Sequence, residues 1–381
     1  MSTVGFLREM WQDGLMFVPK YSITNKILKD IGIVEAAKEV ILNAPLVPAW
    51  EAKFRKEALE RTVHHGTHLE GNPLSVDEVR DVLEGTEVVA RDRDVQEIIN
   101  YRNVLKFIDA VQAQIHSTPF GRSGQVGPYS FTIETILEIH KLTTEKILSP
   151  ESSGKFRIRQ VVIRNTKTGQ ISYTPPPAVE VPYLVEDLVD WINSDEAKQL
   201  HPILKAGIIH YEIARIHPYV DGNGRVARSV ATLVMFLDGY DIRKFFSFEE
   251  YFDENPMNYY LTLQAVSNQL VLDTHERDLT PWLEYFTEGV GIELNRVKEK
   301  VQRISVDARV KDKLGEQVML NERQMLIMEF LHRHKSMQNK EFRKIFPDHS
   351  DDTVLREIKF LKQKGLVKKI GGTKKATYVL K

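Results

Sequence analysis

A polar stretch between two apolar segments constrains this chain more than any other feature of its sequence. It reads His217-Pro218-Tyr219-Val220-Asp221-Gly222-Asn223-Gly224-Arg225-Val226-Ala227-Arg228. Residues 201–216 before it and 226–237 after it are apolar at helical spacing. The sequence therefore predicts a polar loop between two buried helices, at the N-terminus of the second.

This location favours an anion, because a helix N-terminus offers unpaired N–H groups and a partial positive charge. Gly222 and Gly224 are both expected to take backbone angles closed to other residues, so that successive N–H groups curl around phosphate oxygens. Arg225 and Arg228, three residues apart, add charge-assisted donors. The stretch therefore predicts a phosphate site.

Two further side chains indicate which reaction this phosphate site would catalyse. Asp221 is an oxygen ligand suited to Mg²⁺ on the phosphates of a nucleotide. His217 could take a proton from an attacking hydroxyl near pH 7. The alternative is an ordinary helix-capping loop, but a cap needs neither a histidine nor two arginines at these spacings. We therefore expect phosphoryl or nucleotidyl transfer.

The stretch resembles the signature of Fic-domain proteins, His-x-Phe-x-Asp/Glu-Gly-Asn-Gly-Arg-x-x-Arg. Seven of its eight fixed positions match, and Tyr219 replaces the phenylalanine. The resemblance covers about residues 50–288. It implies a mainly α fold with a Fic helical core, and a protein adenylyltransferase that moves AMP from ATP to Ser, Thr or Tyr hydroxyls of a protein, with Mg²⁺. His217 would be the catalytic base, Asp221 would hold the metal, and the ATP-binding residues would include Gly222, Asn223, Gly224, Arg225 and Arg228.

A second, shorter motif lies at Gly66-Thr67-His68-Leu69-Glu70-Gly71. It resembles the inhibitory motif Ser/Thr-x-x-x-Glu-Gly/Asn of a Fic subclass, with Gly66 in place of the hydroxyl residue and Thr67 beside it. The resemblance implies that Glu70 pairs with Arg228, competes with the γ-phosphate of ATP and holds the enzyme inactive. The alternative is a solvated glutamate at a helix end, which is the usual state of this residue.

Several histidines and one aromatic pair lie outside these motifs. His64 and His68 are four residues apart, but we expect no metal site there because no recognisable set of ligands surrounds them in the sequence. His140 and His210 are expected to be packing residues. Tyr260, and after it Tyr259, resemble a Fic pair that forms the pocket for the base or ribose of ATP; the alternative is burial in the core.

The clearest β signal is a hairpin. Residues 156–164 alternate around Ile158, Val161 and Ile163, and residues 170–174 return after a turn. The Gly154–Arg157 stretch before it resembles the start of the Fic flap, which in that family receives a target segment as an extra strand. The alternative is a surface hairpin without a role. Residues 245–255 are expected to form a loop.

The last sixty residues form a pattern of their own. From residue 321 to 381 there are 15 Lys and Arg against 7 Asp and Glu, a net charge of +8, which leaves −9 for the rest of the chain. Helices at 321–332, 339–345 and after Ser350, followed by strands at 366–370 and 376–380, resemble a winged helix-turn-helix. DNA and protein docking both remain alternatives. The candidate DNA-contacting residues are Thr353, Arg356, Lys359, Lys362, Lys374 and Lys375.

The expected domains are an N-terminal helical region with the inhibitory helix (1–100), the catalytic core (101–300), a linker (301–319) and the winged helix (320–381). The chain has no cysteine, which fits a cytoplasmic location, and no apolar run approaches the ~18 residues of a membrane span. Expected partners are a hydroxyl-bearing target protein, the chain itself included, and DNA; a homodimer is left open. Two alternatives to transfer of AMP remain, namely its removal with the help of Glu70, and a nucleotide-sensing transcription regulator.

Overall fold

The structure, a computed structural model, divides the chain into two compact units. The residues it describes are 17–46, 48–117, 130–164, 169, 171–271, 276–304, 320–346, 349–371 and 376–381. The first unit comprises Met1–Val34, Leu59–Asp241 and Phe246–Glu293, and the second comprises Glu35–Ala58, Ile242–Phe245 and Leu294–Lys381.

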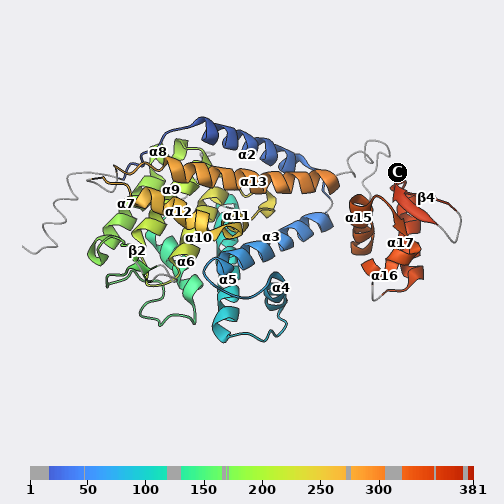
Figure 1. The fold of residues 1–381 in the computed structure, drawn as a ribbon, viewed down its shortest axis with the longest axis horizontal. Coiled ribbons are helices and arrows are strands. Elements are labelled where there is room, and N and C mark those ends of the chain that lie inside the picture. The colour runs from blue at the N-terminus through green and yellow to red at the C-terminus, as the bar shows by residue number, and fades with distance from the viewer. Residues whose placement is uncertain are drawn as a thin grey trace, which may run out of the picture. The chain divides into compact units, whose positions relative to one another are not determined.

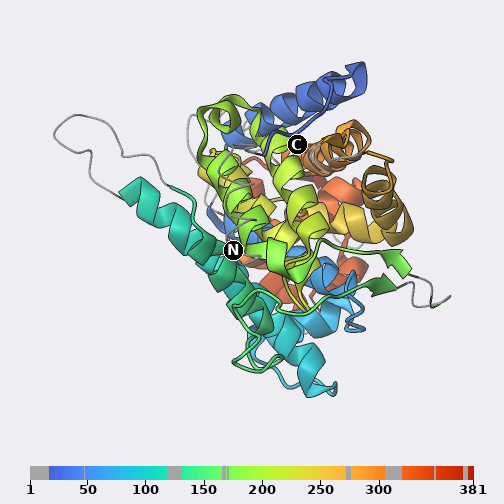
Figure 2. The ribbon, with the colours of Figure 1, turned by 90° about the vertical axis from the view of Figure 1, so that its left-hand side faces the viewer.

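Up to residue 304 the described elements are almost all helical, as predicted (Figure 1). The helices are α2 (Asn25–Asn43), α3 (Pro48–His68), α4 (Val76–Glu84), α5 (Asp92–Ser117), α6 (Ile133–Thr144), α7 (Val181–Asn193), α8 (Asp195–Gln199), α9 (Pro202–Ile216), α10 (Asn223–Leu237), α11 (Phe248–Glu254), α12 (Pro256–Ser267) and α13 (Thr280–Ile304), with 3-10 turns η1 (Ala178–Glu180) and η2 (Ile242–Lys244). Strands β1 (Ile163–Arg164) and β2 (Ile171–Tyr173) form an antiparallel hairpin that stands out from the helices (Figure 2).

Helices α9 and α10 form the centre of the first unit. They pack against each other more extensively than any other pair of described elements, with α7 on α9 and with α5 and α6 on α10. Both are buried on nearly all sides, and they bury charged residues such as Glu212, Arg215 and Arg228 together with apolar ones. Helix α13 also approaches α9 closely, where the Trp282 indole N–H donates to the Gly207 carbonyl at 2.8 Å. The polar loop between α9 and α10 is therefore fixed by the best-packed part of the unit.

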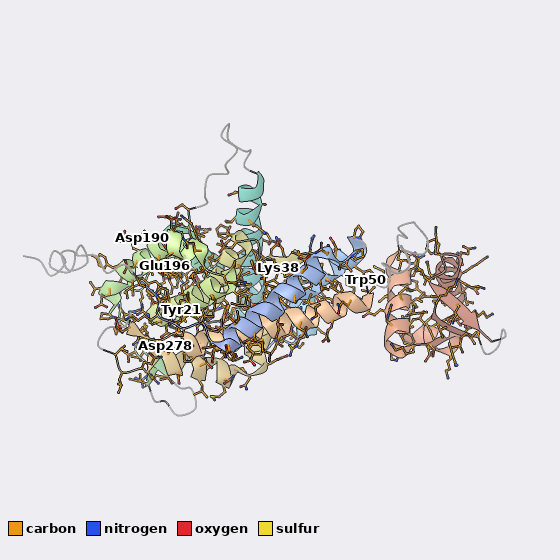
Figure 3. The ribbon with its side chains drawn as sticks, turned by 90° about the horizontal axis from the view of Figure 1, so that it is seen from above. Tyr21, Lys38, Trp50, Asp190, Glu196 and Asp278 are labelled. Carbon is orange, nitrogen blue, oxygen red and sulfur yellow. The ribbon has the colours of Figure 1, made fainter. Side chains whose placement is uncertain are left out.

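The first turns of α2 lie along α13, and Figures 1 and 3 show the two helices side by side. Polar contacts join them, including the Lys26–Glu288 ion pair at 3.1 Å and the hydrogen bond from Thr24 to Glu284 at 2.6 Å. At Gly291 the helices lie close, since a Cβ atom there would make ordinary van der Waals contact with Ile33. This pairing brings the N-terminal helix onto the core.

Helix α3 runs through Gly66, the first residue of the shorter motif, and ends at His68. Two local predictions need correction. The loop expected at 245–255 is wrong, because α11 occupies it and buries Phe248 and Phe252, which are four residues apart. The first strand of the hairpin is shorter than expected. Arg157, rather than an apolar residue, turns inward before it, and the Ile158 side chain is 90% exposed.

The C-terminal residues of the second unit form short helices and a small sheet. The elements are α15 (Glu322–His334), β3 (Met337–Gln338), η4 (Asn339–Glu341), α16 (Phe342–Ile345), α17 (Asp351–Gln363), β4 (Val367–Ile370) and β5 (Thr377–Leu380). The antiparallel sheet has the order β3-β5-β4, so it gains a two-residue strand that was not predicted. Ser350 caps α17 as expected, with its hydroxyl accepting from the Thr353 N–H.

Some expectations fall outside the described residues, namely Lys374, Lys375 and most of the predicted linker. Within the described part of the chain, none of the helices combines the length and the apolar character that crossing a bilayer requires. The predicted domain limits, the homodimer and the cytoplasmic location stay predictions.

Candidate active site

The polar loop has an unusual backbone at both ends. Helix α9 ends at Ile216, and His217 takes a left-handed conformation, with φ at 51° and ψ at 58°. Helix α10 begins after Gly222, whose φ is 82°. A left-handed histidine is strained, because its Cβ atom crowds the backbone, and such strain is common at functional sites. The loop is held in this shape by the packed helices on both sides.

Asn223, predicted to bind ATP, uses its side chain to fix the loop. Its Oδ1 accepts from the Tyr219 N–H and its Nδ2 donates to the Tyr219 carbonyl, both at 2.9 Å. The residue is buried as the first residue of α10. Its backbone N–H remains one of the N-terminal groups of the helix. Its contribution to phosphate binding is therefore expected from the main chain, and the role stays a prediction.

The two glycines of the loop differ, which corrects the expectation that both adopt special backbone angles. Gly222 does so, but Gly224 lies in the first turn of α10 and has no positive φ. What Gly224 supplies is space, because a Cβ atom built there would collide with Oε1 of Glu70. The absence of a side chain on α10 thus admits a carboxylate from the segment after α3.

That carboxylate reaches Arg228, as the resemblance implied. The Arg228 Nη2 donates to Glu70 Oε1 at 2.8 Å and to the Gly66 carbonyl at 2.8 Å. The Arg228 side chain is 0% exposed and that of Glu70 is 26% exposed. Burial opposes the charge on Arg228, but the Glu70 carboxylate outweighs it and raises the pKa of the guanidinium. Among the described residues no group accepts from Arg228 Nε or Nη1, so two buried donors are left for another anion.

The structure explains the glycine that replaces a hydroxyl residue in the inhibitory motif. A Cβ atom at Gly66 would collide with the ring of Tyr101, so no larger residue fits without a shift. Thr67 does not take over the role of a hydroxyl, because its side chain donates back to the Val63 carbonyl at 2.8 Å within α3. Glu70 therefore holds its place through Arg228 and through the backbone of its own segment.

Asp221, the predicted metal ligand, is shared between two cations and a backbone amide. Its Oδ2 accepts from Arg93 Nη2 at 2.9 Å, and its Oδ1 accepts from the Gly222 N–H at 2.6 Å. Arg225 Nη2 lies 3.4 Å from Oδ1, and its Nη1 lies 3.5 Å from Glu97. The predicted residues Asp221 and Arg225 are thus brought together. Arg93 was not predicted, because it lies 128 residues earlier and nothing in the sequence relates it to the loop.

His217, the predicted base, is neutral near pH 7. Burial is the main cause that lowers the pKa of His217, to about 4; the Ala214 carbonyl opposes the shift and the charge of Arg157 adds to it. Its Nδ1 lies 3.4 Å from the Ala214 carbonyl oxygen. A proton on Nδ1 leaves Nε2 free to accept one, as a general base must. The charges of Glu70 and Asp221 also act on this ring, so the three predicted residues share one site.

His140 is buried, as expected, but it also contacts the loop. Its ring stacks on Tyr219, with the ring centroids 3.6 Å apart and the planes 4° from parallel. The Gly154 N–H donates to His140 Nδ1 at 2.9 Å, so Nε2 carries the proton and donates to the Asp221 carbonyl at 3.2 Å. Burial is the main cause that lowers the pKa of His140, to about 4, which keeps the ring neutral. His140 therefore joins the segment before the hairpin to the polar loop.

Arg157 fastens the start of the hairpin to the same loop. Its Nε donates to the His217 carbonyl and its backbone N–H donates to the Pro218 carbonyl, both at 2.9 Å. From β2, the Tyr173 hydroxyl donates to the Arg215 carbonyl at 2.9 Å. The hairpin is thus held beside His217, where the resemblance places a flap. The role of Arg157 was not predicted; the only signal was an arginine within an otherwise alternating strand pattern.

The tyrosine pair separates into two environments. Tyr259 lies in the core, and its hydroxyl is 3.1 Å from Nε2 of His210, a buried histidine as expected. Tyr260 is 41% exposed, and its hydroxyl donates to the Leu69 carbonyl at 3.1 Å. Tyr260 therefore lies beside Glu70, whereas Tyr259 reaches the site only from within the core. This arrangement favours Tyr260 over Tyr259 as the residue facing a nucleotide.

Comparison with known proteins agrees with this geometry. Residues 130–235 match the model of the Fic/DOC family. The Protein adenylyltransferase Fic of Drosophila willistoni is 28% identical over 191 residues, which are 49% of this chain and 34% of that protein. The protein of the same name from Drosophila melanogaster is also 28% identical over 191 residues. The chain thus spans about a third of the length of the curated relatives it matches.

Solved structures extend the likeness to the fold of nearly the whole chain. A Fic family protein from Desulfovibrio desulfuricans superposes with a TM-score of 0.63 at 19% identity, over 96% of this chain and 98% of that one. A Fic domain containing signaling protein from Bacteroides thetaiotaomicron gives a TM-score of 0.57 at 22% identity, over 73% of this chain and 97% of that one. At these identities the likenesses show the fold alone, and they confirm the predicted mainly helical Fic fold.

Proposed function

The chain belongs to the Fic/DOC family, and from this premise we propose that it transfers AMP from ATP to a Ser, Thr or Tyr hydroxyl of a protein. The observation that carries the proposal is the neutral, partly buried His217 next to a helix N-terminus that holds Arg225 and the unsatisfied donors of Arg228. A base and an anion site then lie together. The relatives named Protein adenylyltransferase Fic support the same reaction class.

In the proposed reaction, Nε2 of His217 takes the proton of the target hydroxyl. The hydroxyl oxygen forms a bond to the α-phosphorus of ATP, and the bond from that phosphorus to the bridging oxygen breaks, so that pyrophosphate leaves. The N–H groups of the first turn of α10, Arg225 and Arg228 stabilise the charge that develops on the phosphates. Asp221 offers oxygen ligands for Mg²⁺, which supplies positive charge to the phosphates when bound. The ion pair between Arg93 and Asp221 would then have to weaken, because the metal would share the same carboxylate.

Glu70 opposes this reaction in the proposal. Its carboxylate lies on the guanidinium that the γ-phosphate needs, and the contact is made with a fully buried arginine. ATP that binds with Glu70 in place has its α-phosphate misdirected, and a displacement of about 1 Å can lower a rate ~10²-fold. The observed bond between Glu70 and Arg228 supports autoinhibition.

The hairpin offers a site for the target. Its sheet has two strands, so its outer edges have backbone groups to which an extended segment could pair. Ile171 is exposed on β2, and Ile158 and Val162 are exposed on the segment that leads into β1. Arg157 ties this surface to His217. We propose that the target hydroxyl is delivered to His217 on a strand added to the hairpin.

The test is transfer of label from α-³²P-ATP with Mg²⁺, using the wild-type chain, Glu70→Gly, His217→Ala and the double variant. We expect little label with the wild type and strong label on the chain itself or on lysate proteins with Glu70→Gly. The double variant is the matched control and should remove this label. A Glu70→Gly chain that labels nothing, or labels as well without His217, would refute the transferase.

Removal of AMP with the help of Glu70 is a related candidate, favoured by one observation. The Glu70 side chain is partly exposed, so water can reach a carboxylate that lies beside the phosphate site. A protein labelled by Glu70→Gly would be purified and incubated with the wild-type chain and Mg²⁺. Release of AMP that is lost in Glu70→Gln would support removal, and retention of all label would exclude it.

The C-terminal elements favour a second role, in DNA binding. Three helices and a small antiparallel sheet support the proposal of a winged helix-turn-helix, and α17 exposes Arg356, Lys359 and Lys362. Such a row of cations fits a phosphate backbone. A gel mobility shift at several salt concentrations tests this role. Binding that weakens steeply with salt, and is lost in Arg356→Gln/Lys359→Gln, would support it; no shift at low salt would favour protein docking.

A further inference from the structure

Three histidines of α3 and one carboxylate of α11 converge just before Glu70. His65 Nδ1 lies 2.8 Å from Asp253 Oδ2, and His68 Nδ1 lies 2.8 Å from Asp253 Oδ1. The Asp253 side chain is only 4% exposed. Asp253 lies in a segment for which the sequence predicts a loop or short turn, and no pattern in the sequence relates it to α3. The folding of α11 brings this carboxylate to the histidines.

His64 completes the cluster. Its ring stacks on that of His68, with centroids 5.5 Å apart, and lies 4.7 Å from that of His65. The Leu74 backbone interacts with the His64 ring, but Nδ1 is buried and has no hydrogen-bond partner of normal geometry among the described residues. One ligand atom from each of His64, His65 and Asp253 lies within 4.8 Å of the others. A buried imidazole nitrogen without a partner is costly, which indicates that something else satisfies it.

The donor atoms of this cluster suit a cation. Imidazole nitrogens with one carboxylate oxygen form a donor set typical of Zn²⁺.

We propose that His64, His65, His68 and Asp253 bind one divalent cation of the Zn²⁺ class. Metal bonds of ~2.0–2.1 Å in a tetrahedron require ligand atoms ~3.3 Å apart. The spacing of up to 4.8 Å among the ligand atoms of His64, His65 and Asp253 therefore has to contract by at most ~1.5 Å, which side-chain rotations can supply. His68, whose Nδ1 lies 2.8 Å from Asp253 Oδ1, would be the fourth ligand. The bound cation would replace the protons now shared between the histidines and Asp253.

A cation bound at this cluster would affect the segment that carries Glu70. Helix α3 ends at His68, and Glu70 follows two residues later. A cation that joins α3 to α11 would hold this segment in place, in addition to the hydrogen bond from Tyr260 to the Leu69 carbonyl. Glu70 would then be held on Arg228 more firmly. This consequence rests on the proposed function, whereas the binding of the cation does not.

Binding is tested first, with the full chain freed of any polyhistidine tag and stripped of metal with a chelator. Zn²⁺ is titrated in competition with a chromophoric chelator. We expect one tight equivalent, weakened in His65→Ala and in Asp253→Asn by more than the ~10–100-fold that loss of a second-shell partner costs. The matched control, His332→Gln/His334→Gln, removes two histidines of α15 and should bind as the wild type does. The inference is overturned if the wild type binds no Zn²⁺ tightly, or if all variants bind equally.

A second measurement needs no variant and so does not depend on variants that fold. Co²⁺ added to the wild-type chain should give the visible absorption bands of a low-symmetry site. Because the chain has no cysteine, thiolate bands cannot contribute. Addition of one equivalent of Zn²⁺ should remove these bands. A spectrum that matches Co²⁺ in buffer would overturn the site.

The effect on inhibition is measured with the label-transfer assay at fixed Mg²⁺. Zn²⁺ should lower the label made by the wild type severalfold and leave Glu70→Gly unchanged, and Asp253→Asn should abolish the response. Equal inhibition of the wild type and Glu70→Gly would overturn the effect on Glu70, since it would show competition at the Mg²⁺ site. Tight Zn²⁺ binding by a chain without any transfer activity would instead count against the proposed function and leave the metal site intact.

Discussion

The contact between Glu70 and Arg228 should contribute measurably to stability, and its removal by Glu70→Ala is the sharpest test of the described state. The variant deletes the carboxylate that accepts from Arg228 Nη2 at 2.8 Å and leaves the Gly66 carbonyl as the acceptor of that nitrogen. Arg228 has no exposed surface while Glu70 is in place, so the variant removes the charged partner of a buried guanidinium. The stabilising contact and the proposed inhibitory contact are therefore the same bond.

The expected size lies between two limits. Breaking a fully buried ion pair costs ~3–5 kcal/mol, whereas losing a hydrogen bond to a charged group costs ~1.5–3 kcal/mol. Glu70 is 26% exposed and Arg228 keeps one acceptor, so the lower range applies. We expect a loss of about 2 kcal/mol, or a fall in Tm of about 2–4 °C.

The assay is thermal unfolding of the wild type, Glu70→Ala and a matched control, Glu138→Ala. Glu138 pairs with Lys141 on the surface, where an ion pair contributes ~0–1 kcal/mol. ATP with Mg²⁺ should raise the Tm of Glu70→Ala more than that of the wild type, because phosphate oxygens replace the carboxylate without competition. If Glu70→Ala has the same Tm as the wild type, or if nucleotide raises the Tm of both proteins equally, the bond between Glu70 and Arg228 does not form in solution and the reasoning fails.

Three further outcomes are expected. In a Glu70→Gly background, Arg157→Lys should lower the kcat/KM of label transfer ~10²-fold, because the hairpin loses its bond to the His217 carbonyl; an unchanged value would separate the hairpin from catalysis. Gly66→Ser should lower the free energy of unfolding, measured in urea, by ~1–3 kcal/mol, because the added side chain overpacks against Tyr101. A variant more stable than the wild type would show that Tyr101 does not restrict this position. Folding lowers the pKa of His217 to about 4. The stability that neutral His217 contributes is therefore complete above pH 6.5 and is lost as the pH drops toward 4. Over this pH range the urea midpoint of His217→Asn should fall less than that of the wild type.

The polar loop was predictable because its information is local. The apolar spacing of residues 201–216 and 226–237 fixed two buried helices, and the residues between them could only form a short loop at the start of α10. The pairing of Glu70 with Arg228 spans 158 residues and was accessible only through the resemblance. No rule of spacing within one helix or one turn relates positions so far apart.

The residues that were missed act through distant partners. Arg93 on α5 reaches Asp221, and His140 on α6 stacks on Tyr219, because α5 and α6 both pack against α10. Helix packing of this kind is set by the whole core, so a sequence read in short windows does not contain it. The same holds for Asp253, whose helix was taken for a loop because its seven residues are too few to show a helical period.

The missing side chain at Gly224 has a consequence for how this protein can change. Glu70 occupies the space that a methyl group at Gly224 would take, so the proposed inhibited state depends both on α10 and on the segment after α3. A mutation in either of them would end the proposed inhibition. Only a mutation after α3 would do so without disturbing the first turn of α10, which is the proposed phosphate site. If a random library is selected for variants that transfer label without this inhibition, the changes should therefore fall at Glu70 and its neighbours, and Gly224 should stay unchanged.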